Sequence, residues 1–110
     1  MEFNEYQKKA RETAIYKDQH KIFYPALGLG EETGEVLGKV KKWLRGDDGE
    51  GVMSYERKQA LKEELGDVLW YLAILAEDLG LTFEEVAKTN VEKLQSRKAR
   101  NAIKGDGDVR

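Results

Sequence analysis

Two stretches of the sequence decide its fold: residues 29–35, which read LGEETGE, and residues 63–69, which read EELGDVL. The first carries Glu32 and Glu35, and the second carries Glu64 and Asp67, so each holds a pair of acids three residues apart. That spacing places both carboxylates of a pair on one face of an α-helix, about one turn apart. The two stretches therefore predict two helices that each present an acidic pair.

These acids lack the cationic neighbours that acids on helices usually have. Three of the four have no Lys or Arg three or four residues away: Glu32, Glu64 and Asp67. Glu35 has one such neighbour, Lys39, whereas Glu31 and Glu63 add further negative charge at repulsive spacing. Uncompensated carboxylates beside apolar surface favour a bound cation, and ligation by oxygen alone indicates a hard one such as Mg²⁺.

Composition narrows the class of protein. A chain of 110 residues is expected to form one domain, and a net charge of −2 gives no reason to expect a nucleic acid polymer or an anionic membrane as partner. The absence of cysteine excludes disulfides and thiolate metal sites. No apolar leader opens the sequence, and the uncharged run over residues 68–76 is too short to span a bilayer. We expect a soluble cytoplasmic domain.

The apolar periodicity is helical throughout and predicts an all-α fold. The four expected helices cover residues 3–16, 24–44, 55–78 and 83–98. Ser54 is the predicted N-cap of the third helix, and Thr82 with Glu85 forms a predicted capping box for the fourth. Residues 1–99 are expected to form the domain, and residues 100–110, which are rich in glycine and charge, a flexible tail.

The acidic pairs border the apolar faces of the second and third helices when both are projected at about 100° per residue. Glu32 lies at the edge of one apolar arc, with Glu35 and Glu31 beyond it. Glu64 and Asp67 lie directly beside the apolar stripe of the third helix. Packing of the two apolar faces therefore predicts that four carboxylates converge, as in carboxylate metal sites of helical bundles.

The third helix also predicts oligomerisation. Trp70 and Ile74 lie on faces away from its main leucine stripe, so apolar residues surround it. A short four-helix chain has too little surface to cover such a helix. We therefore expect a four-helix bundle completed by a second subunit, in a homodimer or a homotetramer.

The acidic stretches resemble the EExxE…ExxD signature of MazG-like nucleotide pyrophosphohydrolases, a family of the all-α NTP pyrophosphatase superfamily. The resemblance extends to the helix over residues 83–98, through Asn90, Lys93 and residues 96–98, and to the tail over residues 104–108. It therefore covers nearly the whole chain.

The resemblance implies Mg²⁺-dependent hydrolysis of nucleoside triphosphates to monophosphate and pyrophosphate, with Mn²⁺ as a substitute metal and nucleotide-pool housecleaning as the role. The implied metal ligands are Glu32, Glu35, Glu64 and Asp67. Glu31 is the implied base for the attacking water, Tyr71 the implied contact to base or sugar, and Asn90 a reader of a sugar hydroxyl or base edge. The cations implied to neutralise phosphates are Lys39, Lys42, Lys93 and Arg97.

Other interpretations stay open at this stage. Lys39 is equally suited to pair with Glu35, Tyr71 to pack in the core, and Lys93 and Arg97 to form ordinary surface charge. The whole chain is also compatible with a non-catalytic helical module that binds nucleotide or protein. A phosphoribosyl-ATP pyrophosphohydrolase-like enzyme shares the bundle and the acids.

Overall fold

The computed structural model describes residues 1–108. Within them the chain forms four α-helices and one short 3₁₀ helix, without a β-strand: α1 (Phe3–Arg11), η1 (Asp18–His20), α2 (Phe23–Leu44), α3 (Tyr55–Asp78) and α4 (Phe83–Ala99). The predicted all-α class is confirmed. None of the described helices combines the length and the apolar character needed to cross a membrane.

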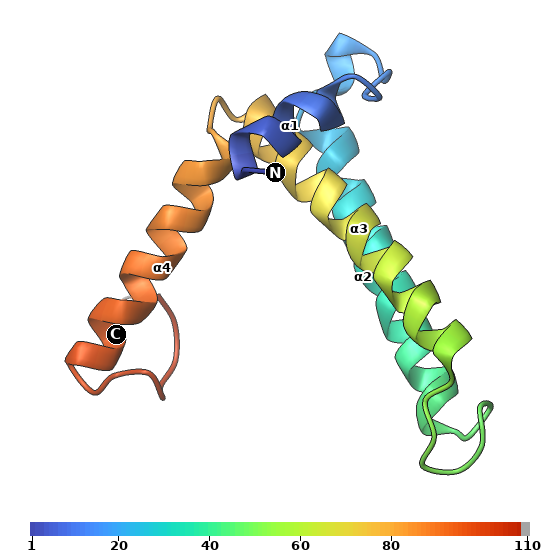
Figure 1. Ribbon diagram of the computed structural model, residues 1–110. Helices are drawn as coiled ribbons and strands as arrows, with labels where there is room; N and C mark the ends of the chain where they lie inside the picture. The colour runs from blue at the N-terminus through green and yellow to red at the C-terminus, as the bar shows by residue number, and fades with distance from the viewer. Residues whose placement is uncertain (109–110) are drawn as a thin grey trace.

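The helices form two arms that diverge from a shared vertex (Figure 1). α2 and α3 run antiparallel, side by side, along one arm, α4 forms the other, and α1 lies across the vertex. The radius of gyration is 17.0 Å, whereas a compact chain of this length is expected near about 13 Å. A single chain therefore leaves the four-helix bundle open.

The core lies at the vertex, where α1, α3 and the start of α4 meet. Ala73 and Ile74 of α3 are fully buried, and Ala10 and Phe83 pack against them. Gln7 is buried beside this core with its amide satisfied: Nε2 donates to two backbone carbonyls of the α3–α4 region, and Oε1 accepts from the Phe83 N–H. Burying a polar group with its partners avoids a desolvation cost and ties α1 to the α3–α4 turn.

The first helix ends five residues earlier than predicted, at Arg11 instead of Tyr16. The indole N–H of Trp70 donates to the carbonyl of Ala10 and to the hydroxyl of Thr13. The Thr13 hydroxyl itself donates to the same carbonyl. The Thr13 N–H also donates to this carbonyl, whereas the Ala14 N–H, its partner in a continuing helix, donates to the Arg11 carbonyl. The prediction was wrong because a turn at Thr13 and the distant Trp70 together use the Ala10 carbonyl.

The start of α2 is held by the last residue of α3. Ile22 precedes α2 with a φ of 69°, a strained conformation for a β-branched residue. Its N–H donates to Asp78 at 3.0 Å, and Arg11 and the Tyr16 hydroxyl donate to the same carboxylate. Burial would raise the pKa of Asp78, but these three donors together lower it. The Asp78 carboxylate thus joins three segments at the vertex.

The remaining helix ends follow local sequence signals. Ser54 accepts a hydrogen bond from the N–H of Arg57, and Thr82 and Glu85 form a capping box, so both predicted caps are confirmed. α4 ends at Ala99, one residue beyond its predicted end, and α2 begins at Phe23, one residue before its predicted start. Caps depend on neighbouring residues, which is why the sequence reveals them.

Candidate metal and nucleotide site

Three of the four predicted acids meet on the α2–α3 arm. Glu32 belongs to α2, and Glu64 and Asp67 belong to α3. One carboxylate oxygen of each lies within 4.8 Å of the others, and in the described chain no other set of acids and histidines gathers in this way. Antiparallel packing of α2 against α3 brings the residues together, and the spacing of three keeps both α3 acids on that side.

The cluster is electrostatically strained. Partial burial raises the pKa of Glu32, and the charge of Asp67 and the contact and charge of Glu64 raise it further. One cation lies at the edge: Lys39 Nζ is 3.4 Å from Glu64 Oε1, with both side chains mostly covered. Lys39 therefore pairs across the helix interface, not with Glu35 one turn away. With one lysine beside three carboxylates, the cluster keeps an excess of negative charge.

Glu35 and Glu31 lie outside this cluster. Both are on α2 with exposed side chains. Glu35 is one turn further along α2 than Glu32, and its carboxylate oxygens are not among those that lie within 4.8 Å of one another. Its role as a fourth ligand stays a prediction. Glu31 lines a neighbouring hollow instead, directly before Glu32 in the sequence.

That hollow, of about 230 Å³, lies beside the acidic cluster and is lined by Tyr24, Leu27, Gly28, Glu31 and Tyr71. The ring centroids of Tyr24 and Tyr71 are 6.4 Å apart, and the ring of Tyr71 also contacts that of Trp70 edge to face. The pKa of Tyr71 is raised by burial first and then by Tyr24 and the nearby Glu32 and Glu31. Tyr71 therefore both packs and forms a wall of the hollow.

Gly28 makes this arrangement possible. A Cβ placed there would lie 2.1 Å from Tyr71 Cε1, inside the ring's van der Waals surface. Tyr24 and Gly28, which the sequence interpretation missed, stand at four-residue steps before Glu32, so they share a helix face with it. That spacing is the signal that could have identified them.

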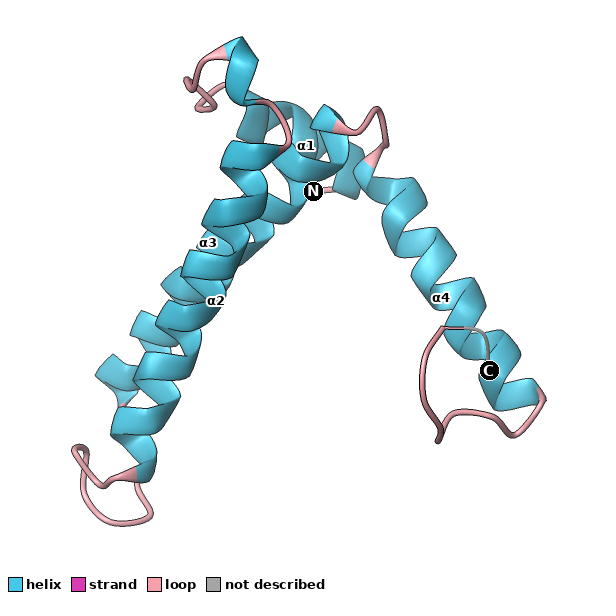
Figure 2. Ribbon diagram, turned by 180° about the vertical axis from the view of Figure 1, so that it is seen from behind, coloured by secondary structure: helices cyan, strands magenta, loops and turns pink. Residues whose placement is uncertain are grey.

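The remaining predicted site residues lie away from the acidic cluster within a single chain. Lys42 is exposed on α2. Asn90 is exposed on α4, and Lys93 and Arg97 of the same helix form ion pairs with Asp108. Because α4 turns away from the α2–α3 arm in both views (Figures 1 and 2), one chain does not join these residues to the acids. Their roles stay predictions.

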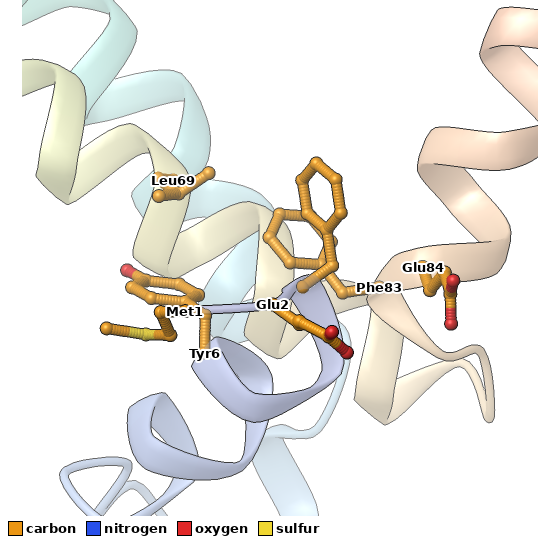
Figure 3. Close-up of a pocket in the computed structure, with 7 residues that line it drawn as sticks. Met1, Glu2, Tyr6, Leu69, Phe83 and Glu84 are labelled. Atoms are coloured by element: carbon orange, nitrogen blue, oxygen red, sulfur yellow. The ribbon is translucent and has the colours of Figure 1, made fainter.

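A larger hollow lies at the vertex, and none of the predicted site residues lines it. It has a volume of about 550 Å³, and Figure 3 shows Tyr6 of α1, Leu69 of α3 and Phe83 of α4 around it. Burial and then the charge of Asp67 raise the pKa of Tyr6. The lining of this hollow at the vertex is mainly apolar, which suits packing against protein better than binding of phosphate.

The donor set of the acidic cluster fits a divalent cation. All three side chains offer carboxylate oxygens, the ligands that Mg²⁺ and Mn²⁺ prefer. Burial and then the charges of Asp67 and Glu64 raise the pKa of Glu32, and a cation among the oxygens would favour its ionised form. Fold and site together define an all-α protein whose paired helices form an acidic, metal-compatible cluster beside an aromatic hollow.

Comparison with known proteins identifies the family. The chain belongs to the MazG nucleotide pyrophosphohydrolase domain family, whose profile matches residues 25–101. It is therefore related to hydrolases that typically depend on a divalent metal. The matched range includes both acidic stretches, all of α4 and the residues that line the aromatic hollow except Tyr24. The predicted family is confirmed.

Two relatives add to this result. Gene 37 protein of Mycobacterium phage L5 is 44% identical over 111 residues, which cover 96% of each chain. The uncharacterized protein YvdC of Bacillus subtilis (strain 168) is 41% identical over 73 residues, or 63% of this chain and 68% of YvdC. No solved structure matches the chain.

Proposed function

We propose that this protein is a Mg²⁺-dependent nucleoside triphosphate pyrophosphohydrolase that converts a (deoxy)nucleoside triphosphate and water into the monophosphate and pyrophosphate. Its role would be to remove surplus or damaged nucleotides in the cytoplasm, where these substrates occur. The observation that carries the proposal is the convergence of Glu32, Glu64 and Asp67 from two helices within 4.8 Å, in a chain of the MazG family.

The acids would hold the metal beside the phosphates. The proposed ligands are Glu32, Glu64 and Asp67, whose oxygens converge, with Glu35 one turn further along α2. When bound, Mg²⁺ would screen the phosphate charge and acidify a nearby water. Lys39, at 3.4 Å from Glu64, lies where its ammonium group can also approach phosphate oxygens, and Lys42 extends the same positive charge along α2.

Glu31 is the proposed general base. In the reaction, the oxygen of water bonds to the α-phosphorus while the bond from that phosphorus to the bridging oxygen breaks and pyrophosphate leaves. The water's proton goes to a carboxylate, and Glu31 is exposed beside the cluster without belonging to it. A carboxylate that is free of metal ligation keeps the basicity this step requires.

The hollow beside Glu31 is the proposed place for the nucleoside. Tyr24 and Tyr71 offer aromatic faces for stacking on a base or sugar, and Leu27 adds an apolar wall. The volume of about 230 Å³ lies below the roughly 300–1,000 Å³ that is usual for small-molecule sites. A second copy of the chain would then supply further contacts.

A homodimer or homotetramer is part of the proposal. Apolar side chains stay exposed along both arms, including Leu37 at 64%, Leu65 at 57% and Val91 at 50%. Exposure of many large apolar side chains on both arms favours a protein interface. An α4 contributed by a second copy would cover the open side of the α2–α3 arm and bring Asn90, Lys93 and Arg97 to the acids.

A turnover screen tests the activity directly. The purified protein is incubated with each common NTP and dNTP, with and without Mg²⁺, and products are resolved by ³¹P NMR. We expect monophosphate and pyrophosphate in the samples with metal alone. Release of single phosphate would mean that a different phosphorus is attacked. Absence of turnover by folded, metal-loaded protein would favour a non-catalytic nucleotide-binding module. Hydrolysis of phosphoribosyl-ATP alone would instead favour a phosphoribosyl-ATP pyrophosphohydrolase-like enzyme.

Sedimentation velocity tests the assembly. One chain has a mass of 12.6 kDa, and we expect a species at two or four times that mass. Leu65→Lys would place a charge in the proposed interface and is expected to yield monomer. Lys62→Ala, on an exposed position of the same helix, is the matched control. A monomeric wild-type protein with full activity would contradict this part of the proposal.

A further inference from the structure

The chain beyond α4 folds back along that helix. Residues 100–108 turn at Asn101, which has a φ of 56°, and the Ala102 N–H donates to the Arg97 carbonyl at 2.6 Å. The segment then returns beside α4 as a loop, drawn in red in Figure 1 and in pink in Figure 2. Residues 109 and 110, the end of the expected tail, lie outside the described residues. We call residues 101–108 the return segment.

The return segment places an acid on two cations of α4. Oδ1 of Asp108 accepts from Lys93 Nζ and from Arg97 Nη2, each at 3.0 Å. Arg97 Nη2 also donates to the carbonyl of Gly107 at 3.4 Å. Lys93 and Arg97 are one helical turn apart, so both reach one anion from the same face.

The carboxylate fits this pair of cations incompletely. A single oxygen serves both Lys93 and Arg97, and one negative charge faces two positive ones. Arg97 is buried, and its Nε has no hydrogen-bond partner among the described residues. Buried arginine donors are usually satisfied, and a guanidinium presents Nε and Nη together to two oxygens. A phosphate group has more oxygens and more charge than Asp108. It could therefore supply both the missing acceptor for Arg97 Nε and the missing negative charge.

The ion pair between Asp108 and Arg97 is easily broken because Asp108 is exposed to solvent. The Asp108 side chain is 81% exposed, whereas that of Arg97 is 4% exposed. An ion pair with one partner in solvent is weak and is screened by salt. The return segment covers Arg97, so an anion can bind the guanidinium only after the segment has moved.

We propose that Asp108 is an internal stand-in for a phosphate group: it occupies an anion site formed by Lys93 and Arg97, and a phosphate of the nucleotide displaces the return segment. The site takes phosphates or pyrophosphate as its class of ligand. The proposal rests on the proposed function in one respect, since the displacing phosphate belongs to that enzyme's substrate or product. The segment thereby sets the apparent affinity of the cation site for phosphates.

The test is binding of inorganic pyrophosphate, measured by calorimetry in EDTA at fixed ionic strength, so that the acidic cluster holds no metal. Asp108→Asn is the key variant, and Asp106→Asn removes the same charge from an exposed position of the same segment. We expect pyrophosphate to bind Asp108→Asn roughly threefold or more tightly than wild type, because no competing carboxylate remains. Asp106→Asn should bind like wild type, and Lys93→Gln more weakly.

Hydrogen exchange of the return segment supplies a second readout. We expect pyrophosphate to increase exchange at residues 101–108 in wild type, and Asp108→Asn to show that higher exchange without ligand. Equal affinity of the two Asp variants would overturn the proposal. So would increased protection on adding pyrophosphate, because the segment would then close over the anion instead of leaving it.

The outcome is separate from that of the proposed hydrolysis. Tighter pyrophosphate binding by Asp108→Asn together with absence of turnover on every nucleotide would leave the stand-in intact and refute the enzyme. Turnover with equal pyrophosphate affinities in both Asp variants would support the enzyme and refute the stand-in.

Discussion

The two arms of this molecule treat charge in opposite ways. On the α2–α3 arm, three carboxylates lie within 4.8 Å, and Lys39 is the cation paired with them in the described chain. On the α4 arm, Lys93 and Arg97 already hold an acid of the same chain, Asp108. On the α2–α3 arm, an added cation would reduce the repulsion between the carboxylates. On the α4 arm, an added anion would replace the Asp108 carboxylate. In the proposed enzyme, the acidic α2–α3 arm would hold the metal, and the cationic α4 arm of a second copy would hold phosphates.

The largest expected effect comes from removing one acid of the cluster. Glu64→Gln should lower kcat/KM at least about a hundredfold and abolish the rise in melting temperature caused by Mg²⁺, since a neutral amide binds the ion poorly. Activity assays and thermal unfolding with and without Mg²⁺ measure both effects. Glu63→Gln, an exposed neighbour with the same charge change, should preserve both. Equal loss in the two variants would break the contrast between the arms.

The vertex that joins the arms should be sensitive to Asp78. Asp78→Asn removes a charge that accepts from Arg11, Tyr16 and Ile22, and we expect a loss of about 2–3 kcal/mol in the free energy of unfolding. Asp18→Asn, on a side chain that is 92% exposed, should change little. Urea denaturation measures both.

The same group predicts a dependence on pH. Because the folded state lowers the pKa of Asp78, its ionised form contributes stability above its ordinary value of 3.8, and that contribution is lost as pH falls toward the lowered pKa. The difference between wild type and Asp78→Asn should therefore shrink in acid. A difference that stays constant down to pH 2 would refute the assignment.

Close packing distinguishes two glycines of the α2–α3 arm on a smaller scale. Gly28→Ala would place a Cβ against the Tyr71 ring and should destabilise the protein by about 1–2 kcal/mol, net of improved helix propensity. Gly30→Ala meets open space on the same helix and should stabilise by about 0.5–1 kcal/mol. Thermal unfolding measures both. Adding Tyr71→Ala to Gly28→Ala should reduce the penalty, and a penalty that persists in full would place its origin elsewhere.

The smallest effect concerns the strain of the acidic cluster without metal. The folded state raises the pKa of Glu32 above its ordinary value of 4.5, so its ionisation lowers stability as pH rises through that interval. Glu32→Gln should therefore stabilise the metal-free protein by a few tenths of a kcal/mol at pH 8, and by less at pH 4. Denaturation in EDTA at the two pH values measures this. Glu35→Gln, outside the cluster, should show no such difference.

Sequence reasoning succeeded where the determining contacts are local. The caps at Ser54 and Thr82 were predictable because each depends on residues within one turn. It failed at the end of α1, where the indole of Trp70, sixty residues away from Ala10, takes the helix's carbonyl. The partner of Lys39 could not be predicted from the sequence for the same reason, because Glu64 lies on another helix.

The candidate site was predictable in part. Spacing and missing cations singled out Glu32, Glu64 and Asp67, and the structure brings their oxygens together. Spacing also grouped Glu35 with them, but Glu35 is exposed outside the cluster, because the packing of α2 against α3 decides which acids meet, and spacing alone does not. The aromatic hollow depends on which ring fits against Gly28, and that is a matter of three-dimensional packing.

The sequence by itself determined an all-α chain with two acidic helices and the family signature, because helix periodicity, caps and i, i+3 spacing are written in neighbouring residues. The tertiary structure alone decided which carboxylates meet, that Lys39 joins them, and that Asp108 holds Lys93 and Arg97. These contacts join residues on different elements, and charges act through distance in space, which helix packing and the return of the chain set.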